Sequence, residues 1–177
     1  YMAMGAQLSF TCAPYLLDSA PGEGEQIVWA ESNAVVYANS VLGARTLKYP
    51  DYLDICIALT GRAPKVGCHL DEQRKAALRI ELPALDGLDD AFYPLLGYHV
   101  GLLCGSRIPL VCGLERVQPT LDDLKAFSAA FATSSAAPLF HIAGVTPEAR
   151  DPQRVIHSGA TLQTEQVSHA DLRRSWD

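Results

Sequence analysis

Short β-rich runs alternate with stretches of helical periodicity through the middle of the chain, and this alternation constrains the fold most. Residues 26–30 (QIVWA) are typical of a short strand, and residues 31–42 (ESNAVVYANSVL) continue as a helix that closes on Gly43. The other expected elements are a helix over 50–60, a strand over 77–82, a helix over 89–103, a strand over 108–112, a helix from Leu121 towards Phe131 and a strand over 137–145. A break of the third helix at Pro94 is left open. Strand and helix in repeated order predict an α/β layer architecture.

The character of the sequence changes after Val145. Residues 146–151 are rich in turn formers, and residues 155–177 are polar with weak periodicity. Ser168 followed by Asp171 is typical of a helix start. We therefore expect residues 1–150 to form one unit and residues 151–177 to be a polar continuation that stops inside a truncated helix. A chain that stops there predicts that the natural protein continues.

Composition excludes several classes of function. The 177 residues carry 14 Lys+Arg against 20 Asp+Glu, a net charge of −6, which argues against a nucleic acid partner. The longest apolar stretch, residues 93–105, is shorter than the roughly 20 residues that cross a bilayer, so no membrane span is expected. The five cysteines include no C-x-x-C pair, which favours a reducing compartment and a cytoplasmic protein.

Common enzyme fingerprints are missing from the sequence. It contains no G-x-S-x-G, G-x-x-x-x-G-K-[ST], G-x-G-x-x-G or H-E-x-x-H motif. Serine hydrolases, P-loop enzymes, Rossmann dehydrogenases and zincins are therefore disfavoured. The candidate site residues lie instead at the ends of expected strands and the starts of helices, where α/β sheets place their ligands.

Two interpretations are open for each candidate near the N-terminus. Cys12, in a loop before Pro14, is either a metal-binding thiolate or a packed loop thiol. Ser32 and Asn33 start a helix, where they cap it or help to bind a carboxylate. Arg45 follows the end of that helix, where it satisfies the helix dipole or holds a substrate carboxylate with its planar fork.

Further candidates follow along the chain. Cys68 and His69 could belong to a metal site, although neighbours on a strand would point in opposite directions. Ser134 and Ser135 place hydroxyl groups at a loop by the edge of the sheet. His141, in the middle of an expected strand, is either a hydrogen-bonded core histidine or a general base.

Five blocks of sequence resemble, in the same order, the catalytic domain of the aconitase X family: TCAPY, WAESNAVVYANSVLGART, YPDYLDICIALTGRAP, DDAFYPLLGYHVG and FATSSAAPLFHIAGVTPEA. The resemblance runs from Thr11 to about Ala149. It implies an aconitase-like three-layer α/β/α fold, of which this chain is a central slice. It also implies an iron–sulfur hydro-lyase that works with a small swivel domain, either fused or a separate subunit. In the bacterial form of the family, the implied reaction removes water from cis-3-hydroxy-L-proline, a small-molecule hydroxy acid, to give Δ1-pyrroline-2-carboxylate.

The resemblance also assigns residues. Cys12 matches the first cysteine ligand of the iron–sulfur cluster, while the other ligands belong to downstream motifs that this chain lacks. The residues of the family's signature segment are Glu31, Ser32, Asn33, Asn39, Ser40, Arg45 and Thr46. We assign Ser32, Asn33 and Arg45 to catalysis, and to substrate binding Glu31, Asn39, Ser40, Thr46, Ser134, Ser135 and His141. Leu47 and Lys48 stand where many members carry Asn-Arg, which leaves the substrate preference open.

Other functions remain to be separated from this one. A mevalonate 5-phosphate dehydratase of the same family needs a phosphate pocket, and few Lys or Arg residues lie near the ESNA segment. An inactive, cluster-free binding fragment is suggested by the missing ligands. A thiol hydrolase built on Cys12 and His141 has no local signature in the sequence.

Overall fold

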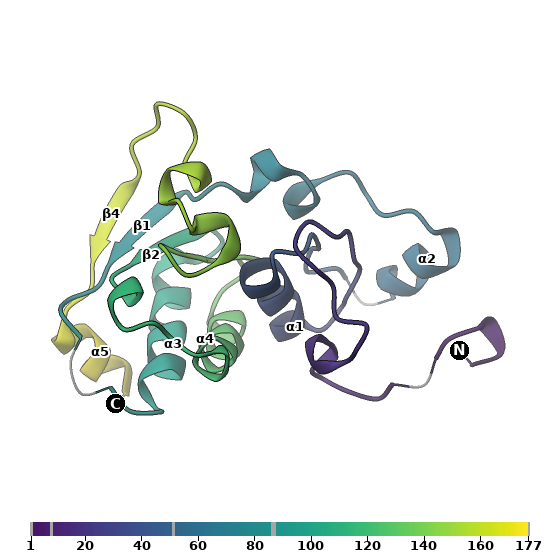
Figure 1. Ribbon diagram of the computed structural model, residues 1–177, viewed down its shortest axis with the longest axis horizontal. Coiled ribbons are helices and arrows are strands. Elements are labelled where there is room, and N and C mark those ends of the chain that lie inside the picture. The colour runs from purple at the N-terminus through teal and green to yellow at the C-terminus, as the bar shows by residue number, and fades with distance from the viewer. Residues whose placement is uncertain (1, 8, 51, 86–87, 177) are drawn as a thin grey trace.

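The computed structural model describes residues 2–7, 9–50, 52–85 and 88–176. Within these residues the centre of the fold is a parallel sheet in the order β3-β2-β1-β4 (Figure 1). Its strands are β1 (Leu78–Glu81), β2 (Pro109–Cys112), β3 (His141–Ile142) and β4 (Gln163–Gln166). Leu78 pairs in register with Pro109 on one side and with Gln163 on the other. The parallel sheet with its helices confirms the expected α/β class.

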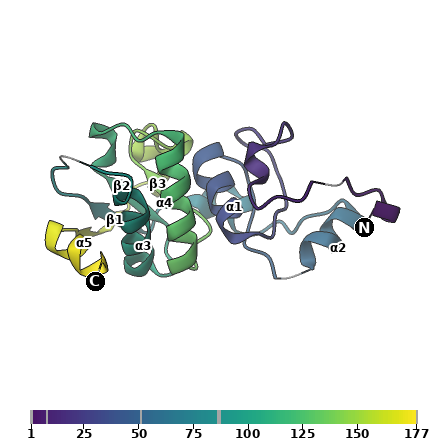
Figure 2. The same ribbon diagram turned by 90° about the horizontal axis from the view of Figure 1, so that it is seen from below.

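Three helices cover one face of the sheet: α3 (Phe92–Cys104), α4 (Leu121–Ser134) and α5 (His169–Trp176) (Figures 1 and 2). Their apolar side chains join Ile80 and Val111 in the main core. The Phe140 ring lies 4.7 Å from that of Phe127 and 5.3 Å from that of Phe131. Edge-to-face aromatic pairs at this spacing stabilise the layer beyond simple burial.

The opposite face of the sheet carries a smaller core. Leu110, Cys112 and Ala143 pack there against Ala149 and Val155. The last two belong to two short 3-10 turns, Pro147–Ala149 and Pro152–Val155, which cover this face. Consecutive residues of β2 therefore point into opposite cores, so the strand is buried on both sides.

Helices α3 and α4 approach each other closely because α3 carries glycine at the contact. A Cβ atom added at Gly97 would lie 2.4 Å from the carbonyl oxygen of Phe127. One turn later, a Cβ atom at Gly101 would lie 1.9 Å from Oγ of Ser134. Both distances are well inside van der Waals contact, so the two backbones pack at a distance that a larger residue does not allow.

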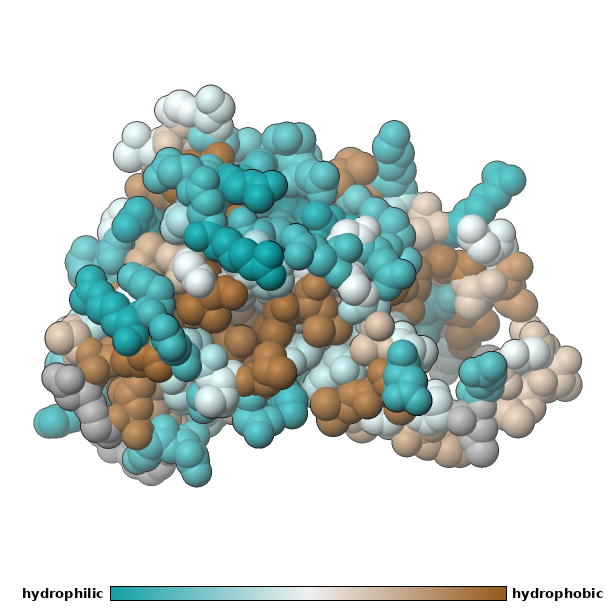
Figure 3. All heavy atoms as spheres, viewed as in Figure 1, coloured by the Kyte–Doolittle hydropathy of each residue, from teal (hydrophilic) through white to brown (hydrophobic). Residues whose placement is uncertain are grey.

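The N-terminal part adds α1 (Ser32–Tyr37) and α2 (Leu53–Thr60), and α1 packs against α4 (Figure 2). The expected helix over 31–42 is confirmed, although its last five residues, Ala38–Leu42, are π-helical. Gly43, with φ at 73°, ends it as predicted. Hydrophobic surface gathers over α2 and the N-terminal segment (Figure 3), where the Phe10 side chain is 94% and Leu59 61% exposed.

Two strand predictions were wrong in extent. In 26–30 only Gln26 forms a bridge, with Arg45, and the other residues are not in a strand. Of 137–145 only His141 and Ile142 form a strand. Asn39 Nδ2 donates to the carbonyl of Pro138 (2.9 Å), and the N–H of Phe140 donates to Ser40 Oγ (2.9 Å). Side chains thus form hydrogen bonds with backbone groups that a longer strand would use for pairing.

Several helix predictions are confirmed with small changes. The open question at Pro94 is settled because Pro94 lies in the first turn of α3, where its missing N–H breaks no helical bond. Thr120 and Asp123 form the expected capping box of α4. Ser168 caps α5 by accepting from the N–H of Asp171 (3.2 Å). The division of the chain near residue 150 stays a prediction.

No helix in the described parts of the chain has the length and the apolar character that a membrane span requires.

Candidate active site

A buried arginine joins the N-terminal part of the chain to the sheet. Arg74 is 1% exposed and precedes β1. Its Nη1 donates to Asn39 Oδ1 (3.0 Å) and to the carbonyl of Cys68 (2.9 Å), and its Nη2 donates to the carbonyl of Asn39 (2.8 Å). Its Nε lies 2.8 Å from Oε1 and 3.1 Å from Oε2 of Glu148. The Glu148 carboxylate compensates the buried charge, and hydrogen bonds satisfy the rest of the guanidinium.

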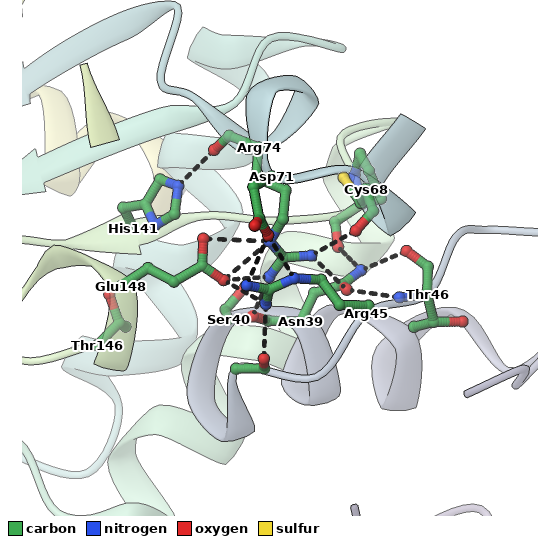
Figure 4. A network of polar contacts seen from close by, with 12 residues as sticks. Asn39, Ser40, Arg45, Thr46, Cys68, Asp71, Arg74, His141, Thr146 and Glu148 are labelled. Carbon is green, nitrogen blue, oxygen red and sulfur yellow. Dashed lines mark hydrogen bonds and ion pairs between the residues drawn. The ribbon is translucent and has the colours of Figure 1, made fainter. Parts of the chain in front are cut away.

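Glu148 is shared between two arginines (Figure 4). Arg45 Nη1 donates to Glu148 Oε1 (2.9 Å) and to the carbonyl of Gly43 (2.7 Å). Arg45 also contacts Oδ1 of Asp71 through Nε (3.0 Å) and Nη2 (2.9 Å). The sequence assigns the Arg45 guanidinium to a substrate carboxylate, but in the structure this group binds the carboxylates of Asp71 and Glu148. Its catalytic role stays a prediction, and a ligand would have to displace the exposed Asp71 side chain.

Predicted site residues line the same network. Asn39 Nδ2 donates to the carbonyl of Thr46 (3.0 Å), and the Thr46 N–H donates to Asn39 Oδ1 (3.0 Å). His141 donates from Nε2 to the carbonyl of Arg74 (2.7 Å), since a carbonyl only accepts. Burial lowers the pKa of His141 to about 4, so its imidazole is neutral at pH 7. The network thus brings together Asn39, Arg45, Thr46 and His141, with Ser40 alongside.

The remaining predicted residues lie along α1 and α4. Glu31, rather than Ser32, caps α1, because its Oε2 accepts from the N–H of Ala34 (2.8 Å). Ser32 is exposed. Ser134 Oγ donates to the carbonyl of Ala130 (3.1 Å) inside α4, and Ser135 Oγ donates to the carbonyl of Gly105 (2.7 Å). Hydrogen bonds with the backbone therefore account for the side chains of Glu31, Ser134 and Ser135.

Two buried oxygen atoms have no hydrogen-bond partner among the described residues: Asn33 Oδ1 and Thr46 Oγ1. Both residues belong to the predicted site. A buried acceptor or hydroxyl left alone costs about 1–3 kcal/mol, so such groups mark places where a bound water or ligand is expected. This observation supports the signature segment as part of a binding site.

A second polar cluster links Gln26, Tyr49 and His69. Gln26 Nε2 donates to the carbonyl of His69 (3.1 Å), which turns Gln26 Oε1 towards His69 Nδ1 (2.6 Å). Nδ1 therefore carries the proton, and His69 Nε2 accepts from the hydroxyl of Tyr49. Burial, and then the charge of Arg74, lower the pKa of His69, which keeps the ring neutral.

The structure gives no metal site at Cys68 and His69. Both lie on a 3-10 turn, Gly67–His69, rather than on the strand considered from the sequence. Burial raises the pKa of the Cys68 thiol to about 11, so it is protonated at pH 7. Within the described ranges, no group of three His, Cys, Asp or Glu side chains could hold a metal ion.

Cys12 is the one residue that the sequence assigns as a cluster ligand. It is exposed, in the N-terminal segment before the turn Pro14–Leu16. An exposed thiol outside any ladder can act as one ligand, but a cluster needs several. The described residues do not by themselves form an iron–sulfur site, and Cys12 supplies at most one thiolate.

The sequence analysis missed two functional candidates, Arg74 and Glu148, and named Lys48 only as a departure from the family pattern. Arg74 and Glu148 are 74 positions apart and stand among other charged residues, so no local pattern separates them from a solvated surface. Lys48 follows the signature segment directly, and its position was the one available signal.

Comparison with known proteins decides the family. The family profile described as Aconitase X first domain matches residues 1–72, and the one described as Aconitase X second domain matches residues 70–177. The chain belongs to the aconitase X family. The buried network thus joins the two aconitase X domains, since Asn39 and Arg45 belong to the first and Arg74 and Glu148 to the second.

Relatives of this aconitase X chain include two proteins named cis-3-hydroxy-L-proline dehydratase. The one from Hypocrea jecorina (strain QM6a) is 59% identical over 99% of this chain and 30% of its own length. The one from Pseudomonas aeruginosa is 60% identical, with the same coverage. The phosphomevalonate dehydratase large subunit of Methanothermobacter thermautotrophicus is 43% identical over 84% of this chain and 36% of its own length. The chain therefore spans about a third of these relatives.

A solved structure confirms the predicted aconitase X fold. The holo-form of aconitase X from Thermococcus kodakaraensis superposes with a TM-score of 0.87 at 36% sequence identity. The match covers 98% of this chain and 43% of that chain.

Proposed function

We propose that this chain is part of a hydro-lyase that removes water from cis-3-hydroxy-L-proline to give Δ1-pyrroline-2-carboxylate. The observation that carries the proposal is the 59–60% identity to two dehydratases of that substrate over 99% of the chain. Phosphomevalonate dehydratase large subunits share 35–43%. A phosphorylated substrate would also need several cations near the start of α1, and the signature segment offers few.

The reaction needs a group that removes the proton next to the carboxylate and an acid that accepts the departing hydroxide. This chain's contribution is to bind and orient the substrate: the unpaired Asn33 Oδ1 and Thr46 Oγ1 are acceptors for its N–H or hydroxyl groups. The Arg74–Glu148 network holds Asn39 and therefore Thr46 in place. Ser32 and Arg45 remain proposed catalytic residues, with Glu31, Ser40, Ser134, Ser135 and His141 proposed to bind substrate.

We also propose an iron–sulfur cluster as cofactor, with Cys12 as one thiolate ligand. A bound cluster supplies a Lewis acid for hydroxide. Since one ligand does not hold a cluster, this chain alone does not supply that acid. The proposed whole protein is cytoplasmic and includes a small swivel domain or subunit, in line with the words "large subunit" in the names of the archaeal relatives.

The proposal is tested with the full-length protein purified without oxygen. Product formation from cis-3-hydroxy-L-proline, followed by NMR, is expected, with no reaction of trans-3-hydroxy-L-proline as the matched stereochemical control. Turnover of mevalonate 5-phosphate alone would contradict the proposed substrate.

Replacing Cys12 by serine in the full-length protein is expected to reduce bound iron and activity together, because the alcohol is a far poorer iron ligand than a thiolate. Iron per protein and the visible absorption spectrum measure the effect. Cys56→Ser is the matched control, since Cys56 is also exposed but lies on α2. Full iron content in Cys12→Ser would remove Cys12 from the ligand set.

A further inference from the structure

Lys48 brings a positive charge to the place where α1 begins and α4 ends. Its Nζ donates to the carbonyl of Ser135 (2.8 Å) and to that of Ala132 (3.4 Å), at the C-terminal end of α4. Helix α1 packs against α4 (Figure 2), and burial lowers the pKa of Lys48, an effect that Cys104 and then Glu31 partly oppose. The side chain is half-buried. Ser135, which is assigned to substrate binding, therefore contacts this ammonium group through its backbone carbonyl.

The charge of Lys48 is not compensated by an ion pair. Its two hydrogen-bond acceptors are neutral carbonyl groups, and no carboxylate of the described residues lies within 4.0 Å of Nζ. The charge of Arg45, by contrast, is already matched by Asp71 and Glu148. Burial is the main influence on the pKa of Lys48 and lowers it, because a half-buried ammonium group is less well hydrated. A half-buried cation without a carboxylate is suited to bind an anionic ligand.

Lys48 contacts a different part of the fold from its neighbours Leu47 and Tyr49. Leu47 packs on Gly67, where an added Cβ atom would lie 2.7 Å from Leu47 Cδ2, and Tyr49 donates to His69. Both of these side chains face the turn at 67–69. Lys48, which lies between them, contacts α4 instead.

We propose that Lys48 is the residue that binds the carboxylate of the substrate. The inference rests on the proposed function, because it assumes a substrate with a carboxylate. A lysine ammonium has three N–H donors, and the two carbonyls at the end of α4 hold it in position while leaving a donor for the ligand. The unpaired oxygen atoms of Thr46 and Asn33 belong to the signature segment that precedes Lys48 in the chain.

The test compares a carboxylate with its neutral amide in the active full-length enzyme. Pyrrole-2-carboxylate and pyrrole-2-carboxamide are used as competitive inhibitors, and the ratio of their inhibition constants measures recognition of the negative charge. Lys48→Met is expected to reduce this ratio by about 10- to 100-fold, the size of one hydrogen bond to a charged group. The KM for cis-3-hydroxy-L-proline should rise by a similar factor. Lys48→Arg keeps the positive charge, so its ratio of inhibition constants should stay close to that of the wild type.

Controls separate this role from helix capping. Lys65→Met removes an exposed lysine and should leave the ratio unchanged. Lys48→Gln removes the charge but keeps an N–H donor. If this variant folds normally and no longer distinguishes the carboxylate from the amide, the inference is supported even if Lys48→Met is unstable. Arg45→Met tests the alternative in which Arg45, rather than Lys48, binds the carboxylate. The inference would be overturned if the ratio of inhibition constants fell strongly in Arg45→Met while active Lys48→Gln and Lys48→Met proteins kept the wild-type ratio. Absence of dehydratase activity in the wild type would instead contradict the proposed function.

Discussion

Replacing Arg74 by methionine is expected to destabilise the sheet and its junction with α1 by about 3–5 kcal/mol. The reason is that Glu148 and Asn39, which Arg74 satisfies, would lose their main partner in a largely buried place. The measurement is hydrogen–deuterium exchange in the full-length protein, read as the opening free energy of amides in β1 and β2.

A double-mutant cycle with Glu148 tests the cause. The double variant Arg74→Met, Glu148→Leu should lose less stability than the sum of the losses in the two single variants, because it removes both charges together. Arg74→Lys keeps the charge but lacks the fork that contacts Glu148, Asn39 and the carbonyl of Cys68, so it should recover only part of the loss. A cost below about 1 kcal/mol for Arg74→Met would show that the network does not hold the two domains in place.

Gly97→Ala is expected to destabilise the protein by about 1–3 kcal/mol, the range for forcing extra atoms into a packed core. At an exposed helix position the same change stabilises a protein by about 1 kcal/mol. The sign of the change in the free energy of unfolding therefore shows whether Gly97 lies at a close helix contact. The new methyl group would meet the carbonyl oxygen of Phe127 at 2.4 Å, and backbone atoms of α4 cannot move aside without shifting the helix. Amide exchange in α3 and α4 measures the effect.

Gly101→Ala provides the comparison on the same helix face. Its nearest obstacle is the Oγ atom of Ser134 at 1.9 Å, a side-chain atom that rotation or deletion removes. The loss should therefore be smaller and should be largely restored by Ser134→Ala. Leu102→Ala, at an exposed position of α3, serves as the control for the helix itself. A stabilised Gly97→Ala protein would mean that α3 and α4 are further apart than described.

The sequence predicted helices better than strands, for a physical reason. Helix starts and ends depend on nearby residues: Thr120 with Asp123 caps α4, and Gly43 and Gly61 end the preceding helical segments with positive φ. Strands depend on distant partners. β4 has the polar sequence QTEQ, which shows no apolar alternation, and it forms because β1 offers it an edge.

The candidate site was predicted only in part for a similar reason. The signature segment is one continuous stretch, so Asn39, Arg45 and Thr46 could be assigned from it, and the structure brings all three into one network. Their partners Arg74 and Glu148 come from the second domain, and a contact across 74 residues leaves no local trace. The contact between Arg45 and Asp71 depends on the fold and has no signal in the sequence.

The order β3-β2-β1-β4 has a consequence for biosynthesis. β2 follows β1 in the chain by about 30 residues, but β4 emerges from the ribosome more than 80 residues after β1. The backbone groups on one edge of β1 therefore stay unpaired while β2 and β3 are translated. The strand that pairs with this edge, β4, consists of glutamines, threonine and glutamate. Its late addition therefore closes the edge of β1 without exposing an aggregation-prone apolar strand in the nascent chain.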